Sequence, residues 1–214
     1  PAGDLGFREA VALSLRSEFG WPVTAGNVGL TSGSQSAFFF LFNLFAGERT
    51  DGGRSRILLP LAPEYIGYAD VGLTPGMLHA QPAGIRELDD GYFKYFVDFD
   101  RLDVPADTGA LCVSRPTNPS GNVLTLDELL RLDALARAHK APFIIDAAYG
   151  LPFPGIQHEH LDSLWNPNIV LCFAILHDSR RRDDGVDREH GPRAAEFAAS
   201  LRSTLLHLQA ADFE

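Results

Sequence analysis

The chain has 214 residues, 45% of them hydrophobic, and a formal net charge of −10, so it holds enough apolar content for one sizeable core. The acidic balance argues against nucleic acid or an anionic membrane as a partner, and no apolar stretch is long enough to cross a bilayer. The two cysteines, Cys112 and Cys172, are too few for a disulfide scaffold, so we expect a reducing compartment, the cytoplasm.

Three segments have the pattern of helices. Apolar residues recur at helical spacing over residues 7–19. Residues 35–45 are rich in Phe and Leu on nearly all sides, which predicts a buried helix. Thr125 followed by Glu128 forms a capping box, and we expect it to open a helix that continues to about residue 139.

Short apolar runs bounded by turn residues predict buried strands. These runs are residues 56–60, 77–80, 109–114, 143–146 and 169–173. Residues 92–99 alternate aromatic and polar side chains, which is typical of a strand with one exposed face. Apolar strands that alternate with helices predict an α/β domain with a mainly parallel sheet.

Polar segments follow several of these strands. They are residues 31–35, 114–121 and 146–149. In open α/β sheets, ligands bind beyond the carboxyl ends of the strands. Asp146 ends an apolar run abruptly, and a carboxylate there is costly unless a cation or hydrogen-bond donors meet it. The pattern therefore predicts a ligand site at this edge.

Each segment also has a plainer interpretation. Ser32-Gly33-Ser34 at a helix start favours a bound phosphate, but serine is also a common helix cap. Tyr65 and Tyr68 follow a strand end, where an aromatic ring either stacks on a planar ligand or packs into the core.

The later segments are equally open when taken singly. The amide of Asn118 either orients a ligand oxygen or belongs to a turn, and Arg115 beside it has the position of a surface charge. Asp146 either pairs with a protonated ring nitrogen or serves as a cap or internal ion pair. Tyr149 is placed to bond a phenolic oxygen of the same ring.

Together, and in this chain order, the segments resemble the fold type I (class I and II) aminotransferases, and within that family the valine–pyruvate aminotransferases. The resemblance runs from about residue 3 to residue 173. Its motifs are residues 31–39, 41–47, 58–68, 114–123 and 145–150. It implies a three-layer α/β/α sandwich, the large domain of an enzyme that binds pyridoxal 5′-phosphate (PLP).

The resemblance also implies a set of cofactor-binding residues and no metal ligand. The set is Ser32, Gly33, Ser34, Gln35, Tyr65, Asn118, Asp146 and Tyr149. The first four match the loop that holds the cofactor phosphate, and Tyr65 matches the aromatic ring stacked on the pyridine. Asn118 and Tyr149 match the partners of the phenolic oxygen. Asp146 matches the aspartate that keeps the ring nitrogen protonated.

One decisive residue departs from the family. The catalytic lysine of these enzymes follows the strand that matches residues 169–173, and His177 stands at its position. An imidazole has no primary amine, and the only lysines are Lys94 and Lys140. We therefore divide the chain into a partial PLP-binding large domain, residues 1–173, and a divergent charged segment, residues 174–214.

The divergent segment has no counterpart in the family. It includes a predicted helix over residues 193–208, while the family's C-terminal small domain is missing. The abrupt loss of similarity suggests a reading-frame change in the coding sequence.

The resemblance implies a transaminase that moves an amino group between valine and pyruvate, with an amino acid and a 2-oxo acid as partners, in a homodimer. Without the lysine we expect weak or no catalysis. The alternative is a non-catalytic phosphate-ligand-binding or interaction module on the same scaffold. A nicotinamide-binding domain is disfavoured because no Gly-x-Gly-x-x-Gly motif follows a strand.

Overall fold

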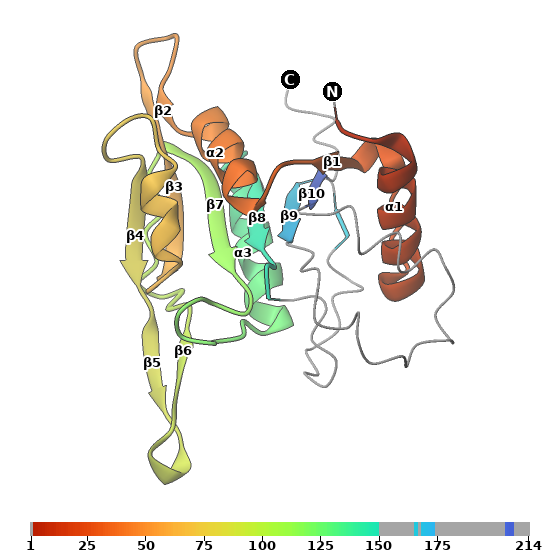
Figure 1. The fold of residues 1–214 in the computed structure, drawn as a ribbon. Helices are drawn as coiled ribbons and strands as arrows, with labels where there is room; N and C mark the ends of the chain where they lie inside the picture. The colour runs from red at the N-terminus through yellow and green to blue at the C-terminus, as the bar shows by residue number, and fades with distance from the viewer. Residues whose placement is uncertain (1, 150–164, 167, 174–203, 208–214) are drawn as a thin grey trace.

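The computed structural model describes residues 2–149, 165–166, 168–173 and 204–207 (Figure 1). The helices in this part are α1 (Leu5–Phe19), α2 (Ser34–Phe45) and α3 (Leu126–Ala138), with 3₁₀ turns η1 (Ala25–Asn27), η2 (Ile66–Asp70) and η3 (Asp89–Gly91). None of the described helices is long and apolar enough to cross a membrane.

One sheet dominates the described residues. Its strands run in the order β1-β10-β9-β8-β7-β3-β2, and β4 pairs with β3 on the side of that path. Strands β9, β8, β7, β3 and β4 pair in parallel. The strands are β1 (Val28–Leu30), β2 (Gly47–Glu48), β3 (Arg54–Ala62), β4 (Leu78–Pro82), β7 (Thr108–Ser114), β8 (Phe143–Asp146), β9 (Ile169–Phe173) and β10 (Thr204–His207).

Helices cover both faces of this sheet (Figure 1). Alternate residues of β7 enter different cores, with Leu111 and Val113 packed among residues of α1 and α3. Ala110 and Cys112 pack among residues of α2 and η2. Because the central strands are buried on both faces, their sequences read as continuous apolar runs. The predicted three-layer α/β/α arrangement with a mainly parallel sheet is confirmed.

Local signals set the helix ends. The Asp4 side chain caps α1 by accepting the Phe7 N–H at 2.8 Å, and Gly20 ends it with φ 68°, a conformation that favours glycine. The predicted capping box of α3 is present: Thr125 Oγ1 accepts the Glu128 N–H at 3.2 Å, and Glu128 Oε2 accepts the Thr125 N–H at 2.8 Å. Both helix starts therefore follow from short sequence motifs.

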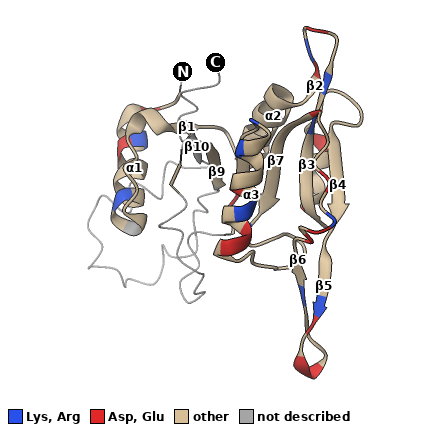
Figure 2. Cartoon of the chain, turned by 180° about the vertical axis from the view of Figure 1, so that it is seen from behind, with Lys and Arg blue, Asp and Glu red and all other residues tan. Residues whose placement is uncertain are grey.

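A two-stranded hairpin projects from the sheet. Strand β6 (Phe93–Phe96) pairs antiparallel with β5 (Gly84–Glu87), and the pair extends away from the domain (Figure 1). Only the second strand was predicted, because residues 84–87 carry no clear alternation. Figure 2 shows acidic residues at the tip of the hairpin, where η3 holds Asp89 and Asp90.

The helix predicted over residues 193–208 is not found where the structure describes this stretch. Thr204–His207 instead form β10, which pairs antiparallel with β1 and β9. Pairing with two strands satisfies the backbone of this segment, and tertiary pairing of that kind overrides a helical pattern. Residues 193–203 and 208 lie outside the described residues.

Candidate functional site

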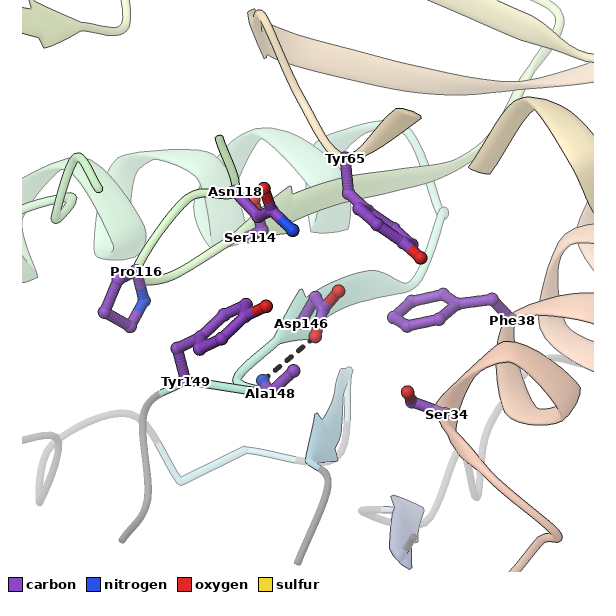
Figure 3. A pocket seen from close by; sticks show the side chains of 9 residues that line it. All are labelled: Ser34, Phe38, Tyr65, Ser114, Pro116, Asn118, Asp146, Ala148 and Tyr149. Carbon is purple, nitrogen blue, oxygen red and sulfur yellow. Dashed lines mark hydrogen bonds between the residues drawn. The ribbon is translucent and has the colours of Figure 1, made fainter. Parts of the chain in front are cut away.

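A pocket lies at the carboxyl edge of the sheet, beyond the ends of β3, β7 and β8 and beside the start of α2 (Figure 3). Its volume is about 250 Å³, which suits a single substituted ring better than a dinucleotide. It is lined by Ser34, Phe38, Tyr65, Ser114, Pro116, Asn118, Asp146, Ala148 and Tyr149. The predicted strand-end segments thus converge on one space.

Asp146 is the carboxylate of this pocket. It is the last residue of β8 and is only 6% exposed. Its Oδ2 accepts the Tyr68 O–H at 2.7 Å. Its Oδ1 accepts the Ala148 N–H at 3.0 Å, the bond drawn in Figure 3. Burial raises the pKa of this carboxyl, although both hydrogen bonds act to lower it. Asp146 belongs to none of the ion pairs in the described part of the chain.

Tyr68 supports Asp146 from the core. Tyr68 is 1% exposed, and the centroid of its ring lies 4.9 Å from that of Phe38 and 5.3 Å from that of Phe42. Of the two interpretations left open by the sequence, core packing applies to Tyr68. The sequence did not show that its hydroxyl would reach Asp146, a residue 78 positions away.

Tyr65 faces the pocket. Its ring meets the Tyr68 ring edge-on, with centroids 5.4 Å apart, and it forms part of the lining. A Cβ at position 67 would collide with the Tyr65 ring, so Gly67 is what allows the ring to lie there. An exposed aromatic face beside a buried carboxylate is suited to a planar, cationic ligand.

Asn118 and Tyr149 also line the pocket. Figure 3 shows the Asn118 amide and the Tyr149 hydroxyl pointing into the same space as Asp146. The Asn118 loop is closed by the Thr117 N–H, which donates to the Asn122 carbonyl at 2.8 Å. The two side chains supply the polar groups that orient a ligand bearing an oxygen.

The predicted phosphate loop is only partly at the pocket. Ser34 lines it, and Gly33 precedes α2 with φ 117°, a conformation that favours glycine. Ser32 Oγ lies 3.3 Å from Ser36 Oγ, and Gln35 Nε2 donates to the Gly67 carbonyl at 2.8 Å. The Gln35 amide therefore braces η2, and the assignment of Ser32, Gly33, Ser34 and Gln35 to a phosphate stays a prediction.

A second carboxylate was missed by the sequence reasoning. The Glu64 carboxylate accepts the Ser114 N–H at 3.1 and 3.2 Å, and it also accepts the Ser114 O–H. Burial raises the pKa of Glu64 to about 8, and the nearby charge of Asp146 adds to this rise. The available signal was the one that identified Asp146: an acidic residue soon after an apolar strand.

Arg115 is buried, at 4% exposure, and its Nε donates to the Leu124 carbonyl at 2.7 Å. The interpretation of Arg115 as a surface charge is therefore wrong. Its guanidinium holds the chain that returns from the Asn118 loop towards α3, because a buried charged donor requires acceptors close by.

Neither lysine lines the pocket. Lys94 Nζ on β6 donates to Asn122 Oδ1 at 3.2 Å and to the Val123 carbonyl at 2.6 Å. Lys140 lies just after α3, with φ 54°. His177 falls outside the described residues. Within the described residues, no group of three His, Cys, Asp or Glu side chains is placed to hold a metal ion.

Comparison with known proteins agrees with this geometry. The family model "Aminotransferase class I and II" matches residues 92–162. The valine–pyruvate aminotransferase of Escherichia coli K12 is 54% identical over 175 residues, which are 82% of this chain and 42% of that protein. The chain belongs to the class I and II aminotransferase family.

Two solved aminotransferase structures extend the comparison. A protein from Psychrobacter arcticum 273-4 assigned as an amino-acid aminotransferase superposes with a TM-score of 0.75 and 44% identity, over 81% of this chain and 42% of that one. Valine-pyruvate aminotransferase from Salmonella typhimurium LT2 superposes with a TM-score of 0.73 and 43% identity, over 96% and 46%. This aminotransferase chain thus spans less than half the length of these relatives.

Proposed function

We propose that this chain is the cofactor-binding part of a PLP-dependent aminotransferase of the valine–pyruvate type, acting on an amino acid and a 2-oxo acid. The observation that carries the proposal is Asp146, a carboxylate buried at the pocket and without an ion pair among the described residues. A buried carboxylate is stabilised by an opposite charge, and a protonated pyridine nitrogen supplies one.

The residues around Asp146 fit the rest of such a ring. Tyr65 offers an aromatic face for stacking, and Asn118 and Tyr149 offer hydrogen bonds to a phenolic oxygen. By stabilising a proton on the ring nitrogen, Asp146 keeps the ring electron-poor. Bound PLP supplies an electron sink for the negative charge that develops at the α-carbon of the substrate.

The start of α2 fits the phosphate. The first amide groups of a helix have no acceptor within the helix, and the helix dipole favours an anion there. Ser34 lies at this point and lines the pocket, so its hydroxyl adds a donor. The phosphate would thus be held by backbone and hydroxyl donors, while the ring is held by Asp146 on β8.

The chain has no lysine at the position expected for the catalytic residue. His177 occupies the expected position, and neither Lys94 nor Lys140 lines the pocket. The proposal is therefore a cofactor cradle with weak or no transamination. This observation also favours the second candidate, a non-catalytic module that binds a phosphorylated ligand on the same scaffold.

The test is a titration of the purified chain with PLP, followed by absorbance, borohydride reduction and mass spectrometry. We expect saturable binding with no adduct on either lysine, and little conversion of valine and pyruvate to alanine and 2-oxoisovalerate. Absence of saturable binding would exclude the proposed function. An adduct on Lys94 or Lys140 would show that a lysine reaches the ring, contrary to the structure.

The same proposal includes a homodimer and a cytoplasmic location. On α2, Phe40 is 61% exposed and Leu44 is 72% exposed, and Ile66 on neighbouring η2 is 85% exposed. Apolar area of this kind favours a covering partner, for which we propose a second copy. Sedimentation should give a dimer that Leu44→Ser shifts towards monomer.

The buried free thiols Cys112 and Cys172 support a reducing compartment, which cell fractionation would test.

A further inference from the structure

Glu64 joins two of the segments that form the pocket. It directly precedes Tyr65, and its carboxylate accepts both the N–H and the O–H of Ser114. Ser114 ends β7, is 2% exposed, lines the pocket and pairs in register with Asp146. The position of the Tyr65 ring over the pocket therefore depends on a carboxyl group fastened to the strand next to β8.

We propose that Glu64 is a positioning residue for the cofactor: as an uncharged acid it fastens the Tyr65 segment to the end of β7. Asp146 then remains the one negative charge that these two carboxyl groups present to the pocket. The inference rests on the proposed function. Removing the acid should loosen the Tyr65 segment, while ionising it should place a second negative charge beside Asp146.

Burial and the nearby charge of Asp146 favour the neutral form of Glu64 and outweigh the hydrogen bonds from Ser114, which act to lower its pKa. Among the residues that the structure describes, the titratable groups that face it are Asp146 on β8, Tyr68 on η2 and Cys112 on β7, and none of these three is cationic. Burial raises the pKa of both Tyr68 and Cys112 well above their ordinary values, so these two stay neutral. Because the pKa of Glu64 is about 8, most of it carries its proton at pH 7.

A glutamine reproduces this neutral acid. Its carbonyl oxygen can accept the Ser114 N–H, and its NH₂ group can donate to Ser114 Oγ, which reverses the bond that the Ser114 O–H donates to Glu64. Glu64→Gln therefore keeps two hydrogen bonds to Ser114 without a titrating group. Glu64→Leu removes both bonds. Glu87→Gln, at an exposed position of β5, is the matched control for the loss of one negative charge.

The first measurement is thermal unfolding of the PLP-free proteins from pH 5 to pH 9. A carboxyl whose pKa is raised by folding binds its proton more tightly in the folded state, so its protein loses stability as pH rises from the unfolded pKa to the folded pKa. The unfolding midpoint of the wild type should therefore fall relative to Glu64→Gln across this range and then run parallel above about pH 8. Glu87→Gln should show no such divergence.

The second measurement is PLP affinity over the same range. Glu64→Gln should match the wild type near pH 7, and Glu64→Leu should bind more weakly at every pH. Between pH 7 and pH 9.5 the ratio of wild-type to Glu64→Gln affinity should change by about tenfold, the effect of a one-unit difference in the Glu64 pKa between the PLP-free and the PLP-bound protein. The ionisation of PLP itself affects both proteins equally and cancels in the ratio.

The outcomes separate the two claims. Unfolding midpoints of wild type and Glu64→Gln that stay parallel from pH 5 to pH 9 overturn the inference whether or not PLP binds. Saturable PLP binding with the same pH profile in both proteins also overturns the inference and leaves the proposed function intact. A wild type that binds no PLP at any pH overturns the proposed function and this inference with it.

Discussion

The carboxyl groups at the two edges of the sheet differ in the charge of their hydrogen-bond donors. At the amino edge, Asp107 receives a bidentate pair from Arg56, with Nε–Oδ2 and Nη2–Oδ1 distances of 2.7 and 2.8 Å. At the carboxyl edge, the donors to Asp146 and Glu64 within the described part of the chain are neutral: a phenol, a hydroxyl and backbone amides.

Because of this difference, the pKa values of the carboxyl groups at the two edges shift in opposite directions. The Arg56 guanidinium lowers the pKa of Asp107, whereas burial raises the pKa of Asp146 and of Glu64. The amino-edge charge is satisfied within the fold. The ionised form of Asp146 at the carboxyl edge costs folding free energy that a cationic ligand would offset, which is the pattern expected of a binding site.

The largest effect is expected from Asp146→Asn, which removes the charge that meets the ring nitrogen. PLP affinity should fall about a hundredfold, or ~2.7 kcal/mol, measured by absorbance titration. The PLP-free variant should unfold at or above the wild-type midpoint at pH 7, because the raised pKa of Asp146 makes its ionised form a cost to the fold. That advantage should vanish as pH falls below the unfolded pKa of aspartate. Equal affinity in the two proteins would contradict the role of Asp146.

Tyr68→Phe should act in the same direction with a smaller effect. Loss of the hydroxyl leaves Asp146 Oδ2 without its 2.7 Å donor and raises the pKa of Asp146 further, because this hydrogen bond acts to lower it. We expect PLP affinity to fall about tenfold, or ~1.4 kcal/mol. Tyr92→Phe, at a tyrosine that is 71% exposed, is the control and should bind as the wild type does.

Asp107→Asn should reverse the pattern, with lower stability and unchanged PLP affinity. The loss should be about 3 °C in unfolding midpoint, since the pair is partly exposed. Because the folded pKa of Asp107 is lowered, the contribution is present above its unfolded pKa and disappears as pH falls through the folded value. The midpoints should therefore differ at pH 5–7, begin to converge below the unfolded pKa of aspartate, and meet only below the lowered folded value. A change in PLP affinity would show that the two edges are coupled.

Much of this fold follows from local sequence signals. The strand β7 is predicted because its central residues, 110–113, form an apolar run, and α3 because Thr125 and Glu128 form a capping box. The position of Asp146 at the edge follows from its place at the end of β8. Strand β5 was missed because its four residues show no period.

The contacts within the site are less accessible to sequence. Tyr68 and Asp146 are 78 residues apart, and Glu64 and Ser114 are 50 apart. They meet because β3, β7 and β8 are consecutive in the sheet, and strand order is not written in any single segment. Side-chain pairings between neighbouring strand ends therefore require the fold before they can be named.

The smallest effect is expected from Lys94→Met, which tests whether the hairpin supports the site. Lys94 Nζ bonds Asn122 Oδ1 and the Val123 carbonyl, within the segment that carries Asn118. Without these bonds the Asn118 loop should sample other conformations and PLP affinity should fall about threefold, as expected for a partly solvated hydrogen bond. Lys140→Met removes the other lysine, which lies after α3 and does not line the pocket. Equal PLP affinities in the two lysine variants would show that the bonds from Lys94 on the hairpin do not support PLP binding. A loss of affinity confined to Lys94→Met would show that residues outside the pocket lining also help to hold PLP.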